Sequence, residues 1–328
     1  MRQFTTGIRK LQHPVNVKTS KDLVPVLSEF SDAHVEVLTV IPVDKDLVAS
    51  EVYVCAVGSM MSVSVEARTI FSETVRRNRG DSLIVAHNHP FQKTPVPSKG
   101  DVEFVRGIKS SGVIIDVPVI DSIVVGSKGQ YSFRDHSLVF EKGNSYVVPK
   151  IEAHKNMSMG TVPVEDRKVQ TSKHAYEVLR FLKKDEKMVV GVMHLTPDLE
   201  MCGLQVFEDD RSMGAKAFAK MILRSILENP ATKYFVMAYN CGVSRKRAQF
   251  EMDMNDILTY IRLGSTLLCV PLMDVLVLES SDYYSFMEHG RVVPRARSYD
   301  TGDMEGLRLK GSRINARPEV PPYSWSFR

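Results

Sequence analysis

The sequence predicts a mixed α/β (α+β) protein made of two tandem domains. Two observations lead to this prediction: the chain repeats itself once, and β-branched runs alternate with amphipathic helical stretches within each copy. The chain has 328 residues, of which 43% are apolar and 25% charged. This is the composition of a globular protein, and at roughly 150 residues per domain the length allows about two domains. A small disulfide-stabilised scaffold, a collagen-like chain and a wholly disordered chain are therefore excluded.

The repeat is visible as short identical strings at a nearly fixed offset. The strings occur at an offset of 152 residues in the first half of each copy and 153 in the second half: Thr19-Ser20-Lys21 with Thr171-Ser172-Lys173, Asp46-Leu47 with Asp198-Leu199, Asn88 with Asn240, Val117-Pro118 with Val270-Pro271, and Tyr131-Ser132-Phe133 with Tyr284-Ser285-Phe286. A period of this length indicates a duplicated domain, since each copy is long enough to bury its own core. We expect a first domain at 1–150, a linker at 151–166, a second domain at 167–290 and a basic, irregular tail at 291–328.

The elements of the first copy follow from local patterns. A short helix is expected at 21–30, then a β-hairpin of 35–43 and 47–56 around the turn Asp44-Lys45-Asp46. The stretch 65–77 places its apolar residues on one helical face. In chain order, the remaining expected elements are a buried strand at 82–86, a helix at 98–111 and closing strands at 119–125 and 130–133. Helices packed on a mixed sheet suit this order.

The densest chemical signal is His87-Asn88-His89-Pro90, followed by Ser98-Lys99-Gly100-Asp101. At the end of a strand, the side chains of residues i and i+2 point to the same face, so both imidazoles can reach one metal ion. A carboxylate from the following helix would be a third ligand. Two histidines, one carboxylate and an open position for water are typical of a catalytic Zn²⁺ site. The sequence therefore predicts metal binding by His87, His89 and Asp101.

Each part of this motif also has a plainer interpretation. A His-x-His pair can lie on the surface without binding a metal. Ser98 and Asp101 form the pattern of a helix-capping box, in which Ser98 is the N-cap residue and Asp101 lies in the first turn. Capping and metal binding can coexist at the start of one helix, so the second interpretation does not exclude the first.

Glu51 is the second unusual residue, because both faces of its strand, 47–56, are apolar. A buried carboxylate is costly unless it is paired or used in catalysis. We expect Glu51 to be the general base that activates a zinc-bound water. The alternative is that this strand lies at an edge and that Glu51 faces solvent.

These residues resemble the RadC-like branch of the JAB/MPN (JAMM) metallopeptidase family. The resemblance rests on the string from Ile84 to Pro90, on Pro97-Ser98 with Asp101, on Val117-Pro118 with Asp121, and on Tyr131-Ser132-Phe133. It covers about residues 17–137. It implies a curved mixed sheet flanked by helices, an architecture like that of cytidine deaminases. It also implies Zn²⁺ on His87, His89 and Asp101, activation of water by Glu51, and help from Ser98 in holding the water or the oxyanion.

The second copy lacks most of these groups. At the offset of 152, the positions of Glu51, His87, His89 and Ser98 fall on Gly203, Tyr239, Cys241 and Phe250, and that of Asp101 falls on Asp253. We therefore expect a metal-free, degenerate JAB/MPN-like domain that forms an intramolecular pseudo-dimer with the first.

The function expected from the resemblance is zinc-dependent hydrolysis of a peptide or isopeptide bond, with a protein substrate such as the C-terminal tail of a ubiquitin-like modifier. The alternative is a non-catalytic interaction module that binds protein or nucleic acid through the basic tail and its aromatic residues Tyr299, Tyr323, Trp325 and Phe327. The motifs of a zinc deaminase are absent. Four dispersed cysteines and no apolar segment long enough for a bilayer lead us to expect a cytoplasmic protein without membrane association.

Overall fold

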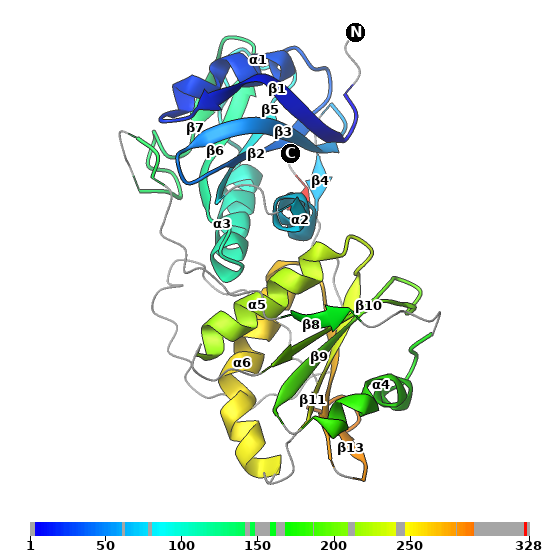
Figure 1. Cartoon of the computed structure of the whole chain (residues 1–328). Helices are drawn as coiled ribbons and strands as arrows, with labels where there is room; N and C mark the ends of the chain where they lie inside the picture. Colours follow the sequence, from blue (N-terminus) through cyan, green and yellow to red (C-terminus); the bar gives the residue numbers. More distant parts are fainter. Residues whose placement is uncertain are drawn as a thin grey trace. The chain divides into compact units, whose positions relative to one another are not determined.

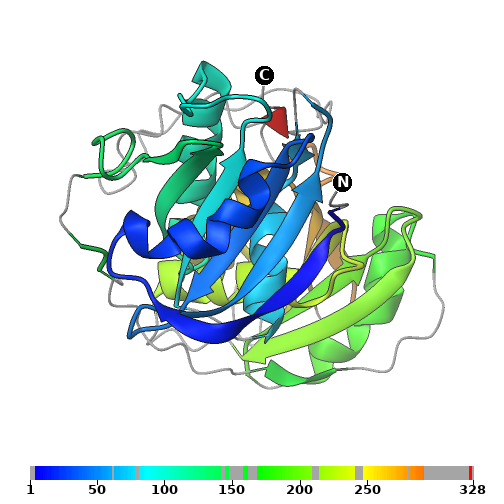
Figure 2. The ribbon, with the colours of Figure 1, turned by 90° about the horizontal axis from the view of Figure 1, so that it is seen from above.

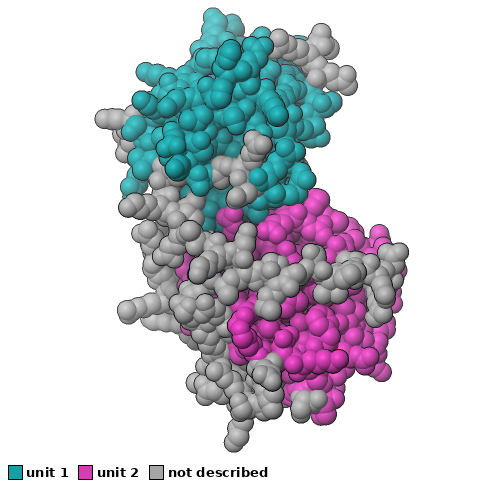
Figure 3. All heavy atoms as spheres, viewed as in Figure 1, with its two compact units in different colours: residues 1–152, 322–328 teal, residues 153–321 magenta. Residues whose placement is uncertain are grey.

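The computed structural model describes residues 4–60, 63–77, 81–141, 145–147, 158–161, 168–185, 187–208, 214–240, 247–279, 281–291 and 325–326. They fall into two compact units. The first contains residues 1–152 and 322–328, and the second contains residues 153–321 (Figure 3). The mixed α/β fold predicted from the sequence is confirmed in both units.

The first unit is built on a six-stranded mixed sheet. Its strands are, in spatial order, β1 (Gly7–Asn16), β3 (Val48–Val57), β2 (Val37–Val43), β5 (Ser82–Asn88), β6 (Val119–Gly126) and β7 (Gly129–Ser132). All neighbours are antiparallel except β5 and β6. The predicted hairpin of β2 and β3 is present, whereas strand β1 was not predicted.

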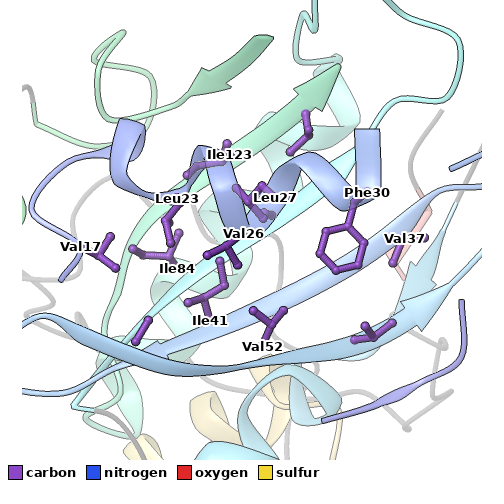
Figure 4. Close-up of a cluster of buried hydrophobic side chains, with 14 of the residues drawn as sticks. Val17, Leu23, Val26, Leu27, Phe30, Val37, Ile41, Val52, Ile84 and Ile123 are labelled. Atoms are coloured by element: carbon purple, nitrogen blue, oxygen red, sulfur yellow. The ribbon is translucent and has the colours of Figure 1, made fainter. Parts of the chain in front are cut away.

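Helices cover both faces of this sheet. Helix α1 (Val24–Ser31), which follows a 3-10 turn at Ser20–Leu23, lies on one face (Figures 1 and 2). Helices α2 (Ala67–Arg77) and α3 (Lys99–Ile114) lie on the other. The core under α1 consists of apolar side chains from the helix and from strands β2, β3, β5 and β6, including Leu27, Phe30, Ile41, Ile84 and Ile123 (Figure 4). Strand β5 is buried along its whole length, as expected of a central strand.

The parallel pair β5 and β6 is joined by helix α3. In such a crossover, the strand's carboxyl end and the helix's amino end meet at one edge of the sheet, where open α/β sheets commonly bind ligands. His87 and Asn88 end β5, and α3 begins at Lys99. The local order strand, loop, helix thus brings the two predicted histidines and Asp101 to the same edge.

The second unit contains β8 (Ser158–Thr161), α4 (Ser172–Leu179), a 3-10 turn at Arg180–Lys184, β9 (Val189–Leu195), β10 (Met201–Glu208), α5 (Ala215–Glu228), β11 (Tyr234–Asn240), α6 (Arg247–Leu267), β12 (Leu272–Leu278) and β13 (Tyr283–Ser285). Its sheet has the order β13-β12-β11-β9-β10-β8. Only β11 and β12 are parallel among its neighbouring pairs. The order and directions of the strands are therefore those of the first sheet.

Two buried polar clusters recur in both units. The side-chain oxygen of Asn88 accepts a hydrogen bond from the Val37 amide at 2.7 Å, and that of Asn240 accepts one from the Val189 amide at 2.7 Å. Likewise, serine hydroxyls donate to buried Asp121 in the first unit and to buried Asp274 in the second. These equivalences are consistent with the predicted repeat, while the predicted intramolecular pseudo-dimer stays a prediction.

Two segments that the sequence predicts to be irregular each contain a short strand. The predicted linker 151–166 contains strand β8, which pairs with β10. The predicted irregular tail contains strand β14 (Trp325–Ser326), which pairs with β4 (Ser64–Val65) of the first unit. Both strands are too short to give a local sequence signal. The rest of the tail beyond residue 291 lies outside the described residues. None of the helices in the described part of the chain has the length and apolar character needed to cross a membrane.

Candidate metal centre

The structure brings together the three side chains that the sequence singled out as ligands. The Nε2 atoms of His87 and His89 lie 3.1 Å apart. Asp101 places Oδ1 at 3.2 Å from Nε2 of His87 and Oδ2 at 3.4 Å from Nε2 of His89. Within the described part of the chain, no other trio of His, Cys, Asp or Glu side chains has ligand atoms this close together.

These separations fit a single metal ion. Zinc binds imidazole nitrogen and carboxylate oxygen at about 2.0–2.1 Å with tetrahedral geometry, which puts neighbouring ligand atoms roughly 3.3 Å apart. The separation of the two imidazole nitrogens, 3.1 Å, is close to this value, and Asp101 places one carboxylate oxygen near each imidazole. One ligand atom from each of the three residues lies within 4.8 Å of the other two. All three side chains are buried, and Asp101 is fully so. Two imidazoles and one carboxylate are a donor set of catalytic zinc sites.

The carboxylate of Asp101 is held in its ionised form. Burial alone would raise its pKa, but hydrogen bonds with His87 and His89 and the backbone amide of Ser98 bring the pKa well below its usual range. Burial opposes the charged imidazole of His89, yet contacts with Asp101 leave the pKa of His89 above its usual value. A negative carboxylate facing two imidazoles is an electrostatic environment that attracts a cation.

Ser98 is the N-cap residue of α3. Its hydroxyl accepts a hydrogen bond from the Asp101 amide at 3.1 Å, and the Asp101 carboxylate accepts one from the Ser98 amide. The capping box expected from the sequence is therefore present together with the ligand cluster. It fixes the first turn of α3 and thereby the position of Asp101. A role of Ser98 in holding an oxyanion stays a prediction.

The loop between His89 and Ser98 is anchored to the turn after β6. The amides of Ser127 and Lys128 donate to the carbonyl oxygens of Gln92 and Lys93 at 3.1 and 2.9 Å. Gly126 permits this approach, because a Cβ there would lie 2.9 Å from each of these oxygens. The loop also supplies Gln92, whose side-chain oxygen lies 3.2 Å from Nδ1 of His89. Such a partner orients a metal-binding imidazole.

Glu51 does not lie at this site, so its expected role as general base is corrected. Leu38 of β2 pairs with His87 on one side and with Ala56 of β3 on the other. Glu51 lies five residues along β3 from Ala56, which is roughly 16 Å at the rise of a strand. Glu51 is buried, as the sequence predicted, but it pairs in register with Lys10 of β1.

Glu36 lies where Glu51 was expected. It precedes β2 by one residue, and the register of β2 with β5 continues to place it opposite His89. Its side chain is 4% exposed, and its Oε2 atom has no hydrogen-bond partner among the described residues. Burial raises the pKa of Glu36 to about 7. The charge of Asp101 also raises this pKa, whereas His89 and a hydrogen bond from the Val63 amide lower it. A carboxyl group of that pKa can exchange protons near neutral pH.

Asn88 fixes the chain on both sides of Glu36. Its side chain points to the face of β5 opposite the two histidines. Its oxygen accepts from the Val37 amide, and its Nδ2 donates to the carbonyl of Val35 at 3.1 Å. Val35 and Val37, the neighbours of Glu36 in the chain, are thus both hydrogen-bonded to the side-chain amide of Asn88.

The second unit carries other side chains at two positions equivalent to Glu36 and His87. Met188 and Tyr239 occupy the positions of Glu36 and His87 at the offset of 152, and Tyr239 is fully buried. Cys241 lies outside the described residues, as do the side chains of Phe250 and Asp253. A thioether and a phenol cannot replace a proton acceptor and a neutral imidazole ligand.

Comparison with known proteins supports the interpretation of the first unit. Residues 17–138 match the family described as RadC-like JAB domain. UPF0758 proteins are similar over this region. One from Chloroflexus aurantiacus is 34% identical over 116 residues, which are 35% of this chain and 50% of that protein. One from Streptococcus uberis is 34% identical over 132 residues, which are 40% of this chain and 58% of that protein.

The chain thus spans about half the length of the curated relatives that it matches. The matched region contains His87, His89, Asp101 and Glu36 and ends before the second unit. Residues 17–138 therefore match the RadC-like JAB domain family, and the UPF0758 relatives support this assignment for the first unit.

Proposed function

We propose that the first unit is a zinc-dependent hydrolase of peptide or isopeptide bonds. The observation that carries the proposal is the convergence of His87, His89 and Asp101 at separations of 3.1–3.4 Å, next to the buried carboxyl group of Glu36. JAB-type domains are linked to metal-dependent hydrolysis, which supports the reaction class. The type of bond and the metal are the proposed part.

Each residue of the site has a separate proposed role. His87, His89 and Asp101 would hold the ion. When bound, zinc supplies Lewis acidity toward the scissile carbonyl and makes a water molecule more acidic. Glu36 accepts a proton from the attacking water at Oε2, the carboxylate oxygen without a partner in the described part of the chain, and passes it to the leaving amine. Burial of all four side chains limits competing solvent.

The first test is zinc content by elemental analysis of the full chain and of the double variant His87→Ala/His89→Ala. We expect about one zinc per chain in the natural protein and none in the variant. Absence of zinc from both proteins, with circular dichroism showing an intact fold, would refute the proposed site.

The second test separates Glu36 from Glu51. Zinc-loaded Glu36→Gln and Glu51→Gln are incubated with a pool of peptides and Nε-linked isopeptides, and cleavage is followed by mass spectrometry. Loss of a general base lowers the rate by about 100-fold or more, so Glu36→Gln is expected to lose cleavage while retaining zinc. Glu51→Gln is the matched control, since it also removes a buried carboxylate. Equal loss in both variants would contradict the assignment of Glu36.

A further inference from the structure

The C-terminal end of the chain returns to the first unit as a strand. Residues 322–328 group with this unit, and strand β14 pairs antiparallel with β4, with Trp325 opposite Val65 and Ser326 opposite Ser64 (Figure 1, red beside cyan). Strand β4 belongs to neither six-stranded sheet. Among the described residues, its ladder partner is β14, so β4 offers an edge to which an extended segment adds.

Strand β4 lies next to the candidate metal centre on the side of Glu36. Val63, the residue before β4, donates its amide to the Glu36 carboxylate. The loop that leads to β4 is bonded to the backbone of Glu36, because the Glu36 amide donates to Ser59 and the Gly58 amide donates to Glu36, both at 2.8 Å. The position of β4 is thereby tied to that of the proposed base.

Strand β14 also contacts helix α3, whose first turn carries Asp101. Strand β14 therefore contacts two elements of the first unit: β4, which follows the Glu36 contact, and α3, the helix that carries Asp101.

The surroundings suit an extended segment with apolar side chains. Three strongly exposed apolar residues lie within three positions of residues that form or contact the centre: Met60, Phe91 and Val96, at 58%, 67% and 64% exposure. The sequence Tyr323-Ser324-Trp325-Ser326-Phe327 alternates aromatic and small polar residues. The exposed apolar side chains near the centre and the aromatic residues of the C-terminal sequence share an apolar character.

We propose that the edge of β4 is the docking strand for an extended peptide beside the metal centre, and that β14 of this chain occupies this edge as a built-in competing ligand. The identity of the displaced ligand as a substrate rests on the function proposed above. The docking itself does not, because it depends only on backbone pairing. A segment tethered to its own site acts at an effective concentration that reaches the millimolar range, so a free peptide binds only when it displaces the tail.

The test uses the full chain with Ser326→Pro, which removes an amide hydrogen and disrupts pairing with β4. Ser326→Ala is the matched control, because it keeps the backbone donor. Hydrogen–deuterium exchange is measured on fragments that contain residues 63–66. We expect exchange at least tenfold faster in Ser326→Pro than in the natural protein, and no change in Ser326→Ala. Equal exchange in all three proteins would overturn the proposed docking.

A second measurement addresses competition. A fluorescently labelled synthetic peptide of residues 320–328 is titrated with each protein, and binding is followed by anisotropy. We expect at least tenfold tighter binding to Ser326→Pro than to the natural protein or Ser326→Ala. Equal binding to all three, or binding to none, would overturn the proposal that the tail competes for this edge.

The two proposals fail in distinguishable ways. Zinc content is measured in the same three proteins and is expected to be equal, since position 326 supplies no ligand. If exchange and peptide binding behave as expected but no protein cleaves any peptide, the docking edge stands and the hydrolase assignment is wrong. If zinc binding and cleavage are found but Ser326→Pro is indistinguishable from the natural protein, the hydrolase assignment stands and the docking edge is wrong.

Discussion

Replacing Asn88 by alanine tests whether the amide between the two histidines positions Glu36. Asn88 is fully buried, and its amide group bonds the backbone on both sides of Glu36: the Val37 amide at 2.7 Å and the Val35 carbonyl at 3.1 Å. A longer contact of 3.5 Å reaches the Ala33 carbonyl. Alanine removes all three interactions but leaves the histidine positions in the sequence unchanged.

The expected cost follows from the groups that lose their partners. Each buried polar group without a partner costs about 1–3 kcal/mol, and entry of water relieves part of this. With one amide and one carbonyl strongly affected, Asn88→Ala is expected to destabilise the first unit by about 2–4 kcal/mol. Because the chain around Glu36 loses its anchor, cleavage should fall by more than zinc affinity does.

The assay is hydrogen–deuterium exchange resolved by fragment, since it reports the opening of each unit separately. Asn240→Ala is the matched control: its side chain makes the same bond to Val189 in the unit that lacks the site. We expect Asn88→Ala to lower protection in the first unit and Asn240→Ala to lower it in the second. A loss of less than about 0.5 kcal/mol in Asn88→Ala, or equal loss of cleavage in both variants, would refute the positioning argument.

Three further predictions concern a buried carboxyl group, two helix caps and a buried thiol. Burial raises the pKa of Asp121 to about 6 in the folded protein, above the unfolded value of 3.8. The folded state therefore holds the proton more tightly, so the stability of the metal-free natural protein relative to Asp121→Asn should fall by up to about 3 kcal/mol as the pH rises from 4 to 6 and then level off. Parallel stability curves in chemical denaturation would contradict this. Ser98→Ala should cost about 1 kcal/mol through loss of the cap of α3, as should Thr171→Ala, which removes the equivalent bond in α4. An unchanged rate of hydrogen–deuterium exchange in the first turn of α3 in Ser98→Ala, or of α4 in Thr171→Ala, would refute the predicted capping contribution. Burial raises the pKa of the Cys55 thiol, so iodoacetamide at pH 8 should label Cys55 only after unfolding; rapid labelling of the native protein, detected by mass spectrometry, would exclude this environment.

The ligand cluster was predictable because local geometry decides it. Two histidines at i and i+2 on the end of a strand share a face in any sheet. A Ser-x-x-Asp pattern fixes the start of a helix and places the acid in its first turn. The crossover from β5 to α3 then leaves little freedom in where His87, His89 and Asp101 meet.

The proposed base could not be chosen in this way. Glu36 and Glu51 are both acids in apolar strand-like runs, and both are buried. An acidic residue in an apolar strand-like run identifies both glutamates as candidates. Only the pairing register shows that Glu36 lies opposite His89, while Glu51 lies farther along the sheet. Register depends on contacts between segments distant in the chain, which no local pattern contains.

The sequence by itself predicted a repeat within the chain and a mixed α/β fold for each half, and it determined that only the first half carries two histidines and an aspartate in ligand spacing. These properties follow from periodicity and from identical strings. The tertiary structure alone decided which glutamate faces the histidines, that β8 lies in the predicted linker, and that β14 pairs with β4 about 260 residues earlier in the chain. A two-residue strand has no periodicity of its own, and it forms only because a distant edge supplies its hydrogen-bond partners.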